Sequence, residues 1–275
     1  MKDLHKTTGR RFSLLELVVV VMILASLAGL VISKVDWARR SADTATAASG
    51  MAQVQQNLQL YRTAKGVYPD RFDSLIDAST LATTPAIYDE LFIGHGLTTS
   101  TLRPATFAAA PPGPPTGFVF SLQHVGMATV VDHDPAATFP GDSATSIRAA
   151  SAFGFNVSTV LAAVNPASTL ARSIYPASTP ATADPTAHTI LPNGVTGEEP
   201  VTLVALGVGP NCSAIGSTMS SAPMCSAVDP TGNYPRYVAI FACFASGKRA
   251  ELEGVIDSTG QVVTGQLKNF YQNEP

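Results

Sequence analysis

Charged residues are scarce in this chain. Only 13% of its 275 residues are Asp, Glu, Lys or Arg, and the formal net charge is −3. Beyond the first eleven residues the sequence contains no cluster of basic side chains. Binding to nucleic acid depends on such clusters, so we expect no nucleic-acid partner.

The chain also lacks the common catalytic signatures. It contains no Gly-x-Ser-x-Gly, no phosphate-binding loop and no His-Glu-x-x-His, and its five histidines are scattered. Residues 132–134, Asp-His-Asp, offer three metal ligands in a row, but neighbouring residues of a strand point to opposite faces, which favours a polar turn. Asp229 and Asp257 are also typical of turns rather than of a calcium site. We therefore predict no enzyme activity, no metal site and no cofactor.

Cysteine is scarce as well, with only Cys212, Cys225 and Cys243. Their spacing does not match a zinc site, which uses closely paired ligands. Cys212 and Cys225 lie in a segment rich in Gly, Ser and Pro, and they are the better candidates for a disulfide. Cys243 lies in an apolar segment and is predicted to be a buried thiol. A Cys225–Cys243 disulfide is the alternative.

The one long hydrophobic run lies near the N-terminus. Residues 17–32 carry no charge, and with residues 12–16 they make a stretch of about 20 residues, the length that a helix needs to cross a bilayer. Four of the first eleven residues are basic, which by the positive-inside rule keeps that end cytoplasmic. We predict residues 1–11 as a cytoplasmic leader and residues 12–33 as a single span of the inner membrane, with a periplasmic or extracellular C-terminal domain. A cleaved signal peptide is the alternative.

The helical pattern continues past the hydrophobic run. Apolar residues recur at steps of three and four through residues 35–61, which marks one apolar stripe. Lys65 and Gly66 then supply a C-terminal cation and a glycine cap. Gly50 costs the helix about 1 kcal/mol relative to alanine and marks a bend or a weak point. The soluble half of this helix, residues 34–66, would pack its stripe on the exported domain.

The exported domain, residues 67–275, is predicted to be rich in short strands. Several apolar or alternating segments predict strands, and the last three predict an antiparallel meander. Residues 158–164 predict a short helix, and proline-rich connectors are expected near 104–117 and 176–185. These elements predict an α+β fold, in which the long helix packs on an antiparallel sheet. The expected strands are residues 117–120, 125–131, 201–207, 237–244, 249–256 and 261–264.

Two motifs carry a resemblance to a known family. Residues 12–16, Phe-Ser-Leu-Leu-Glu, followed by the apolar run, resemble the processing and methylation signature of type IV pilins and type II secretion pseudopilins. Residues 61–69 resemble the Tyr…Gly-x-Tyr-Pro ending of the long helix in major pseudopilins. Residues 71–77 resemble the short helix that follows it there. The resemblance covers about residues 9–80 and implies a pilin-like fold.

The resemblance also implies roles for individual residues. In that family a prepilin peptidase removes the leader, here between Arg11 and Phe12, and the new N-terminal Phe12 is methylated. The family usually has Gly before the cut, where this chain has Arg11. Glu16 would pair with the N-terminal amine of a neighbouring subunit during assembly, which agrees with the need of a carboxylate in apolar surroundings for a partner. The implied partners are other copies of the chain, other pilin-like subunits, the peptidase, an inner-membrane assembly platform and membrane lipid.

We therefore expect a structural subunit of a type II secretion pseudopilus or a type IV pilus-like filament, which assembles through its hydrophobic N-terminal helix. The alternative is a binding module, such as a minor pilin or an anchored receptor, that holds a ligand with its exported domain. Residues 136–190, rich in Ala, Ser, Thr and Pro, are the expected contact surface. Replacing Glu16 with Ala separates the two hypotheses, because only assembly needs the carboxylate.

Overall fold

The structure of the chain is a computed structural model. It describes residues 14–75, 101–106, 117–131, 152–154, 160–181, 188–225, 234, 236–257 and 259–263. The chain divides into two compact units, Met1–Asp43 and Thr44–Pro275. The strands all belong to the second unit.

Helix α1 (Leu14–Lys65) runs without interruption through Gly50. Its end is the one that the sequence predicts. Gly66 has a φ of 76°, and its N–H donates to the carbonyl oxygen of Arg62 at 2.8 Å, as a glycine cap does. The prediction of a helix end at Lys65 is therefore confirmed.

The predicted membrane span is not supported. Within the part of the chain that the structure describes, no helix combines the length and the apolar character needed to cross a membrane. A crossing requires about 20 consecutive apolar residues in one helix. The predicted localisation, a single-pass protein of the inner membrane, is therefore wrong.

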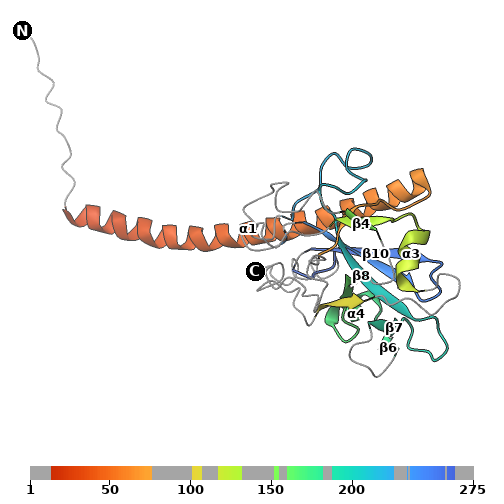
Figure 1. Ribbon diagram of the computed structural model, residues 1–275. Helices are drawn as coiled ribbons and strands as arrows, with labels where there is room; N and C mark the ends of the chain where they lie inside the picture. The colour runs from red at the N-terminus through yellow and green to blue at the C-terminus, as the bar shows by residue number, and fades with distance from the viewer. Residues whose placement is uncertain are drawn as a thin grey trace, which may run out of the picture. The chain divides into compact units, whose positions relative to one another are not determined.

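Strand β8 (Val201–Gly207) is the central strand of the sheet (Figure 1). One of its edges pairs along its whole length with β9 (Val238–Phe244), which pairs in turn with β10 (Ala250–Ile256). The β9–β10 hairpin and strand β8 confirm three of the strand predictions. The third strand of the expected meander is only an isolated bridge between Ile256 and Val262.

The other edge of β8 is shared by three shorter strands. These are β7 (Thr189–Leu191), β5 (Val160–Val164) and β1 (Phe72–Asp73). Strand β2 (Leu102–Thr106) pairs with β5, and β6 (Thr179–Pro180) pairs with β7. Both β2 and β6 include prolines that the sequence assigned to loose connectors.

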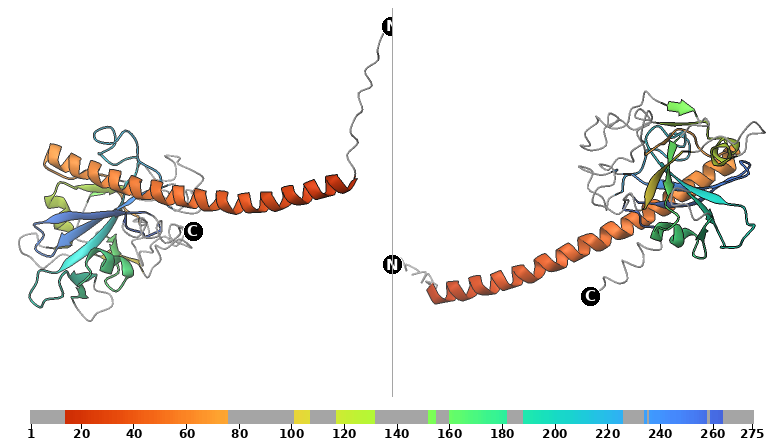
Figure 2. Two further views of the ribbon diagram at one scale, coloured as in Figure 1. Left: turned by 180° about the vertical axis from the view of Figure 1, so that it is seen from behind. Right: turned by 60° about the horizontal axis from the view of Figure 1, so that its bottom comes forward.

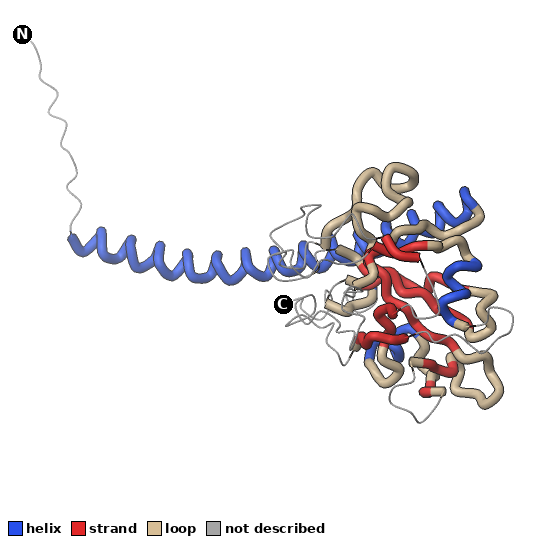
Figure 3. Tube along the Cα trace, viewed as in Figure 1, coloured by secondary structure: helices blue, strands red, loops and turns tan. Residues whose placement is uncertain are grey.

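Strand β1 continues the sheet toward β3 (Thr129–Val131) and then β4 (Ala152–Gly154). The β1–β3 pair is parallel, whereas the other pairs are antiparallel. Two short helices, α3 (Phe118–His124) and α4 (Thr169–Ile174), complete the described elements (Figure 3).

The predicted fold class, a pilin-like α+β fold with a long helix packed on an antiparallel sheet, is wrong. The described residues instead form one sheet of ten strands, in which the β1–β3 pair is parallel. Figure 2 shows this part of the chain from two further sides. Several of these strands are two or three residues long. A strand that short carries no periodic pattern, and only its partners from distant parts of the chain define it.

Three local predictions are also wrong. Residues 118–120, predicted as part of a strand, begin helix α3. Residues 160–164, predicted to be helical, form strand β5, and residues 72–73, in the expected short helix, form β1. Short apolar segments fit a helix or a strand equally well, and pairing with distant strands decides between them.

The sheet is buried on both faces. Alternate residues of β9 enter two hydrophobic clusters, with Phe241 in one and Ile240 in the other. The first cluster includes Met51 and Leu58 of α1, and the second includes Leu170 of α4. This arrangement explains why every residue of β8 and β9 is buried.

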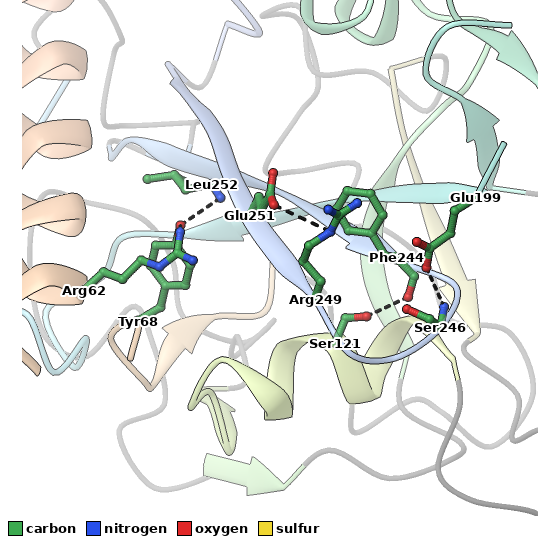
Figure 4. Close-up of polar contacts among 9 residues, drawn as sticks. All are labelled: Arg62, Tyr68, Ser121, Glu199, Phe244, Ser246, Arg249, Glu251 and Leu252. Carbon is green, nitrogen blue, oxygen red and sulfur yellow. Dashed lines mark hydrogen bonds and ion pairs between the residues drawn. The ribbon is translucent and has the colours of Figure 1, made fainter. Parts of the chain in front are cut away.

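A tyrosine joins the end of α1 to the edge strand β10 (Figure 4). Arg62 Nη1 donates to the Tyr68 hydroxyl at 2.7 Å, and the backbone N–H of Leu252 donates to the same oxygen at 3.1 Å. The guanidinium of Arg62 also lies over the Tyr68 ring, 4.6 Å from its centroid. Tyr68 is buried, so its hydroxyl satisfies a backbone donor of β10 inside the protein.

Candidate functional site

Large apolar side chains are exposed along the first turns of α1. Eleven such side chains between Leu14 and Leu27 are each 45–81% exposed. They include the consecutive residues Leu17 to Leu24, so they cover every side of the helix rather than one stripe. Exposed apolar patches of this extent usually mark an interaction surface. We call residues 14–27 the apolar segment and treat it as the candidate interface.

Glu16, predicted to be the assembly residue, lies within the apolar segment. It is exposed in the first turn of α1, where the helix dipole favours a carboxylate. It is also the one ionisable residue of that segment. The predicted processing residues Arg11 and Phe12 lie outside the described residues.

The predicted disulfide between Cys212 and Cys225 is not formed. Cys212, Cys225 and Cys243 are all thiols, and each is buried in the first hydrophobic cluster. Burial raises the pKa of Cys212 to about 12, and it also raises the pKa of Cys243. The prediction of a buried thiol at Cys243 is confirmed.

Two of the predicted turn segments, residues 132–134 and Asp229, lie outside the described residues. Asp257 is described, and it stabilises a turn. Its Oδ1 accepts hydrogen bonds from the backbone N–H groups of Thr259 (3.0 Å) and Gln261 (2.9 Å) and from the Thr259 hydroxyl (2.6 Å). This is the Asx-type turn that the residue type predicts.

A second candidate site surrounds Asp73, which sequence analysis did not single out. Asp73 belongs to β1 and is 2% exposed. Its Oδ2 accepts a hydrogen bond of 2.6 Å from the Tyr234 hydroxyl, whereas its Oδ1 has no hydrogen-bond partner. The carboxylate fits only because Gly207 and Gly209 have no β-carbon, which would overlap Tyr234 and Asp73.

The surroundings of Asp73 favour its neutral form. Burial raises the pKa of Asp73 to about 7, and this effect exceeds the opposing effects of the Tyr234 hydrogen bond and the Arg236 charge. Arg236 is itself buried and donates from Nη1 to the carbonyl oxygen of Ala222 at 3.0 Å. An Asp in a two-residue strand gives no sequence signal of burial, which is why sequence reasoning missed it.

A cavity of about 210 Å³ lies beside the bulge of β10. Its polar lining comes from Gln55, Ser173 and Glu253, and its apolar lining includes Ile240 and Val263. Tyr175 hydrogen-bonds to Glu253. Partial burial and the charge of nearby Glu251 raise the pKa of Glu253 despite that hydrogen bond. This is a third candidate site, suited to a small ligand.

Comparison with known proteins found no relationship on which to base a function. No family model matches the chain, and no curated protein and no solved structure matches it.

Proposed function

We propose that this protein is a filament subunit that polymerises through the apolar segment of α1, with other copies of the same chain as its main partner. The exposure of that segment on every side of the helix is the observation that supports the proposal. One flat partner surface would cover only one side of the helix. Several identical helices packed around it would cover all sides, and each copy of the chain brings one such helix.

The resemblance of residues 12–16 to the pilin and pseudopilin signature suggests how the subunits would pair during assembly. A prepilin peptidase would cut between Arg11 and Phe12, and Glu16 would pair with the new amine at Phe12 of a neighbouring copy. A carboxylate that enters an apolar helix bundle needs such a cation, because an unpaired buried charge is costly. Other pilin-like subunits and an assembly platform would then be further partners.

The first experiment compares Glu16→Ala with Asp43→Ala in the organism that makes the protein. Asp43 is an exposed carboxylate of the same helix outside the apolar segment, so it is a matched control. We expect filaments, scored by electron microscopy and by sedimentation of sheared material, to be lost in Glu16→Ala and retained in Asp43→Ala. Normal filaments in Glu16→Ala, or no filament in the unmodified strain, would contradict the proposal.

Intact mass of the protein recovered from that organism tests the processing step. We expect a chain that begins at methylated Phe12. A chain that still begins at Met1 in assembled filaments would show that assembly does not need the cut after Arg11.

Ligand binding is the second candidate function, and the cavity beside β10 favours it. Glu253 supplies a carboxylate to the lining of the cavity, and Ile240 and Val263 supply apolar surface, a combination that fits a small amine with an apolar body. Benzylamine, with benzyl alcohol as the uncharged control, can be titrated while the backbone NMR signals of β10 are followed. Binding of the amine alone, weakened at least tenfold by Glu253→Gln, would support this function. Equal or absent shifts for both compounds would exclude it.

A further inference from the structure

We propose that the segment from Asp70 to Leu75, which we call the β1 latch, opens locally under the control of one proton on Asp73. The segment stays inserted between β3 and β8 while Asp73 is neutral, and its opening becomes easier as the carboxyl group ionises. The proposal rests on contacts within the second unit and does not depend on filament assembly.

The latch is inserted into the sheet by few hydrogen bonds. Strand β1 has only two residues, and it pairs with β8 at a single position, Asp73 opposite Gly207. On its other side it pairs in parallel with β3, where the Ser74 N–H donates to the carbonyl oxygen of Val131 at 2.8 Å. A strand this short gives up few hydrogen bonds when it leaves the sheet, compared with β8 or β9, so the main cost of opening is the exposure of the buried side chains of Phe72 and Leu75.

The backbone of the latch is also strained. Arg71 has a φ of 63° and Leu75 a φ of 58°, and both are non-glycine residues in the left-handed region. The β-carbon makes this conformation unfavourable for such residues, and the surrounding contacts must hold it. Opening would release both residues to ordinary backbone conformations.

The carboxyl group of Asp73 supplies the proton control. It is buried, its Oδ1 has no hydrogen-bond partner, and its Oδ2 has one, from Tyr234. The Arg236 guanidinium favours the carboxylate form of Asp73. The Cys212 thiol, on which the charges of Asp73 and Asp70 both act, stays neutral because its pKa is also raised. A buried carboxylate with one hydrogen bond is costly, and opening would let water solvate it.

One end of the latch is held firmly, so the opening stays local. The carboxylate of Asp70 accepts hydrogen bonds from the backbone N–H groups of Ala128 (3.0 Å) and Thr129 (2.8 Å) and from the Thr129 hydroxyl (3.0 Å). The Asp70 N–H donates to the Ser213 hydroxyl at 2.7 Å. These bonds make Asp70 the fixed point, and residues 71–75 form the part that opens.

The direction of the pH effect follows from the two pKa values of Asp73. Its pKa is raised from 3.8 to about 7 in the folded protein, and exposure to water in the open latch would restore the lower value. The closed form therefore binds the proton more tightly, and opening becomes more frequent as the pH rises from about 4 to about 7. Above pH 7 the closed form is ionised too, and the opening equilibrium levels off.

Hydrogen exchange followed by mass spectrometry tests the latch on the full chain. After correction for the intrinsic exchange rate, we expect the protection of residues 71–75 to fall about tenfold per pH unit between pH 5 and pH 7. The amides of β9 should stay better protected than residues 71–75 at every pH, because they exchange only when the whole protein unfolds. Equal protection of β9 and residues 71–75 would show that the segment opens only by global unfolding, and no fall in the protection of residues 71–75 would show a passive segment; either result would overturn the proposal.

Two variants identify the responsible group. Asp73→Asn keeps the shape but cannot ionise, so protection of residues 71–75 should no longer depend on pH. Tyr234→Phe removes the hydrogen bond that lowers the pKa of Asp73, so the fall in protection should extend to higher pH than in the unmodified protein. The proposal would be overturned if the protection of residues 71–75 depended on pH in Asp73→Asn as it does in the unmodified protein. It would also be overturned if the fall in protection ended at the same pH in Tyr234→Phe as in the unmodified protein.

Discussion

The hydroxyl group of Tyr237 lies against the backbone of Gly50, in the space that a β-carbon at position 50 would occupy. The ring of Tyr237 is buried in the same hydrophobic cluster as Met51 and Val54 of α1. Gly50 therefore allows a close approach between the helix and the residue that precedes β9. The sequence alone indicated only a weak point in the helix there, and the contact supplies the physical reason for the glycine.

Replacing Gly50 with alanine should destabilise the protein even though alanine is the better helix former. The new β-carbon would overlap Tyr237, and overpacking of this kind costs about 1–3 kcal/mol, against a gain of about 1 kcal/mol in helix propensity. Chemical denaturation should show the net loss. Gly29→Ala is the matched control, since a β-carbon there meets nothing within 4 Å. A Gly50→Ala protein as stable as Gly29→Ala would contradict the contact.

Replacing Tyr68 with phenylalanine should lower the free energy of unfolding by about 1–3 kcal/mol, because the Leu252 N–H would lose its acceptor. Arg62→Ala is the comparison: it removes the second donor but leaves the Tyr68 hydroxyl in place for Leu252. Its cost should be smaller, about 1 kcal/mol or less. Thermal melts of both variants show which one loses more stability. A larger loss of stability in Arg62→Ala would show that the contact of Tyr68 with the helix matters more than its contact with β10.

Asp73 should make the whole protein less stable as the pH rises from about 4 to about 7. Its folded pKa lies above its ordinary value of 3.8, so its contribution is complete below pH 4 and is lost as the pH passes through about 7. The expected slope is roughly 1.4 kcal/mol per pH unit from this one group. Urea denaturation at pH 5 and pH 7.5 measures it. The slope should be smaller in Asp73→Asn, and equal slopes in the two proteins would refute the assignment.

The three thiols should react slowly in the folded protein. Cys212, Cys225 and Cys243 are each at most 3% exposed, and the pKa of Cys212 is raised to about 12, so little thiolate forms at neutral pH. Labelling with iodoacetamide should modify none of them before unfolding and all three in denaturant without a reductant. A single modified cysteine in denaturant would reveal the disulfide that the structure does not contain.

Long or strongly patterned segments were the ones that sequence reasoning placed correctly. The end of α1 at Lys65, strand β8 and the β9–β10 hairpin each follow from local residues: a glycine cap, a seven-residue segment that is mostly apolar, and a glycine turn. Segments of two to five residues were misassigned, as at β1 and β5. Their conformation depends on pairing with β8, which is far away in the chain.

The candidate sites also differ in whether the sequence alone reveals them. The apolar segment and Glu16 are visible in the sequence, since a run of consecutive apolar residues keeps its character in any fold. The roles of Asp73 and Gly50 are not, because they depend on which side chains the fold brings within contact: Tyr234 in one case and Tyr237 in the other.

The sequence by itself determined the hydrophobic N-terminal run, the helix that ends at Lys65 and the strands with enough residues to show a pattern. Only the tertiary structure decided how the described strands pair, that the cysteines remain thiols and that a carboxyl group is buried beside Tyr234. Local patterns report on neighbours along the chain. Burial, pairing and shifted pKa values depend on neighbours in space.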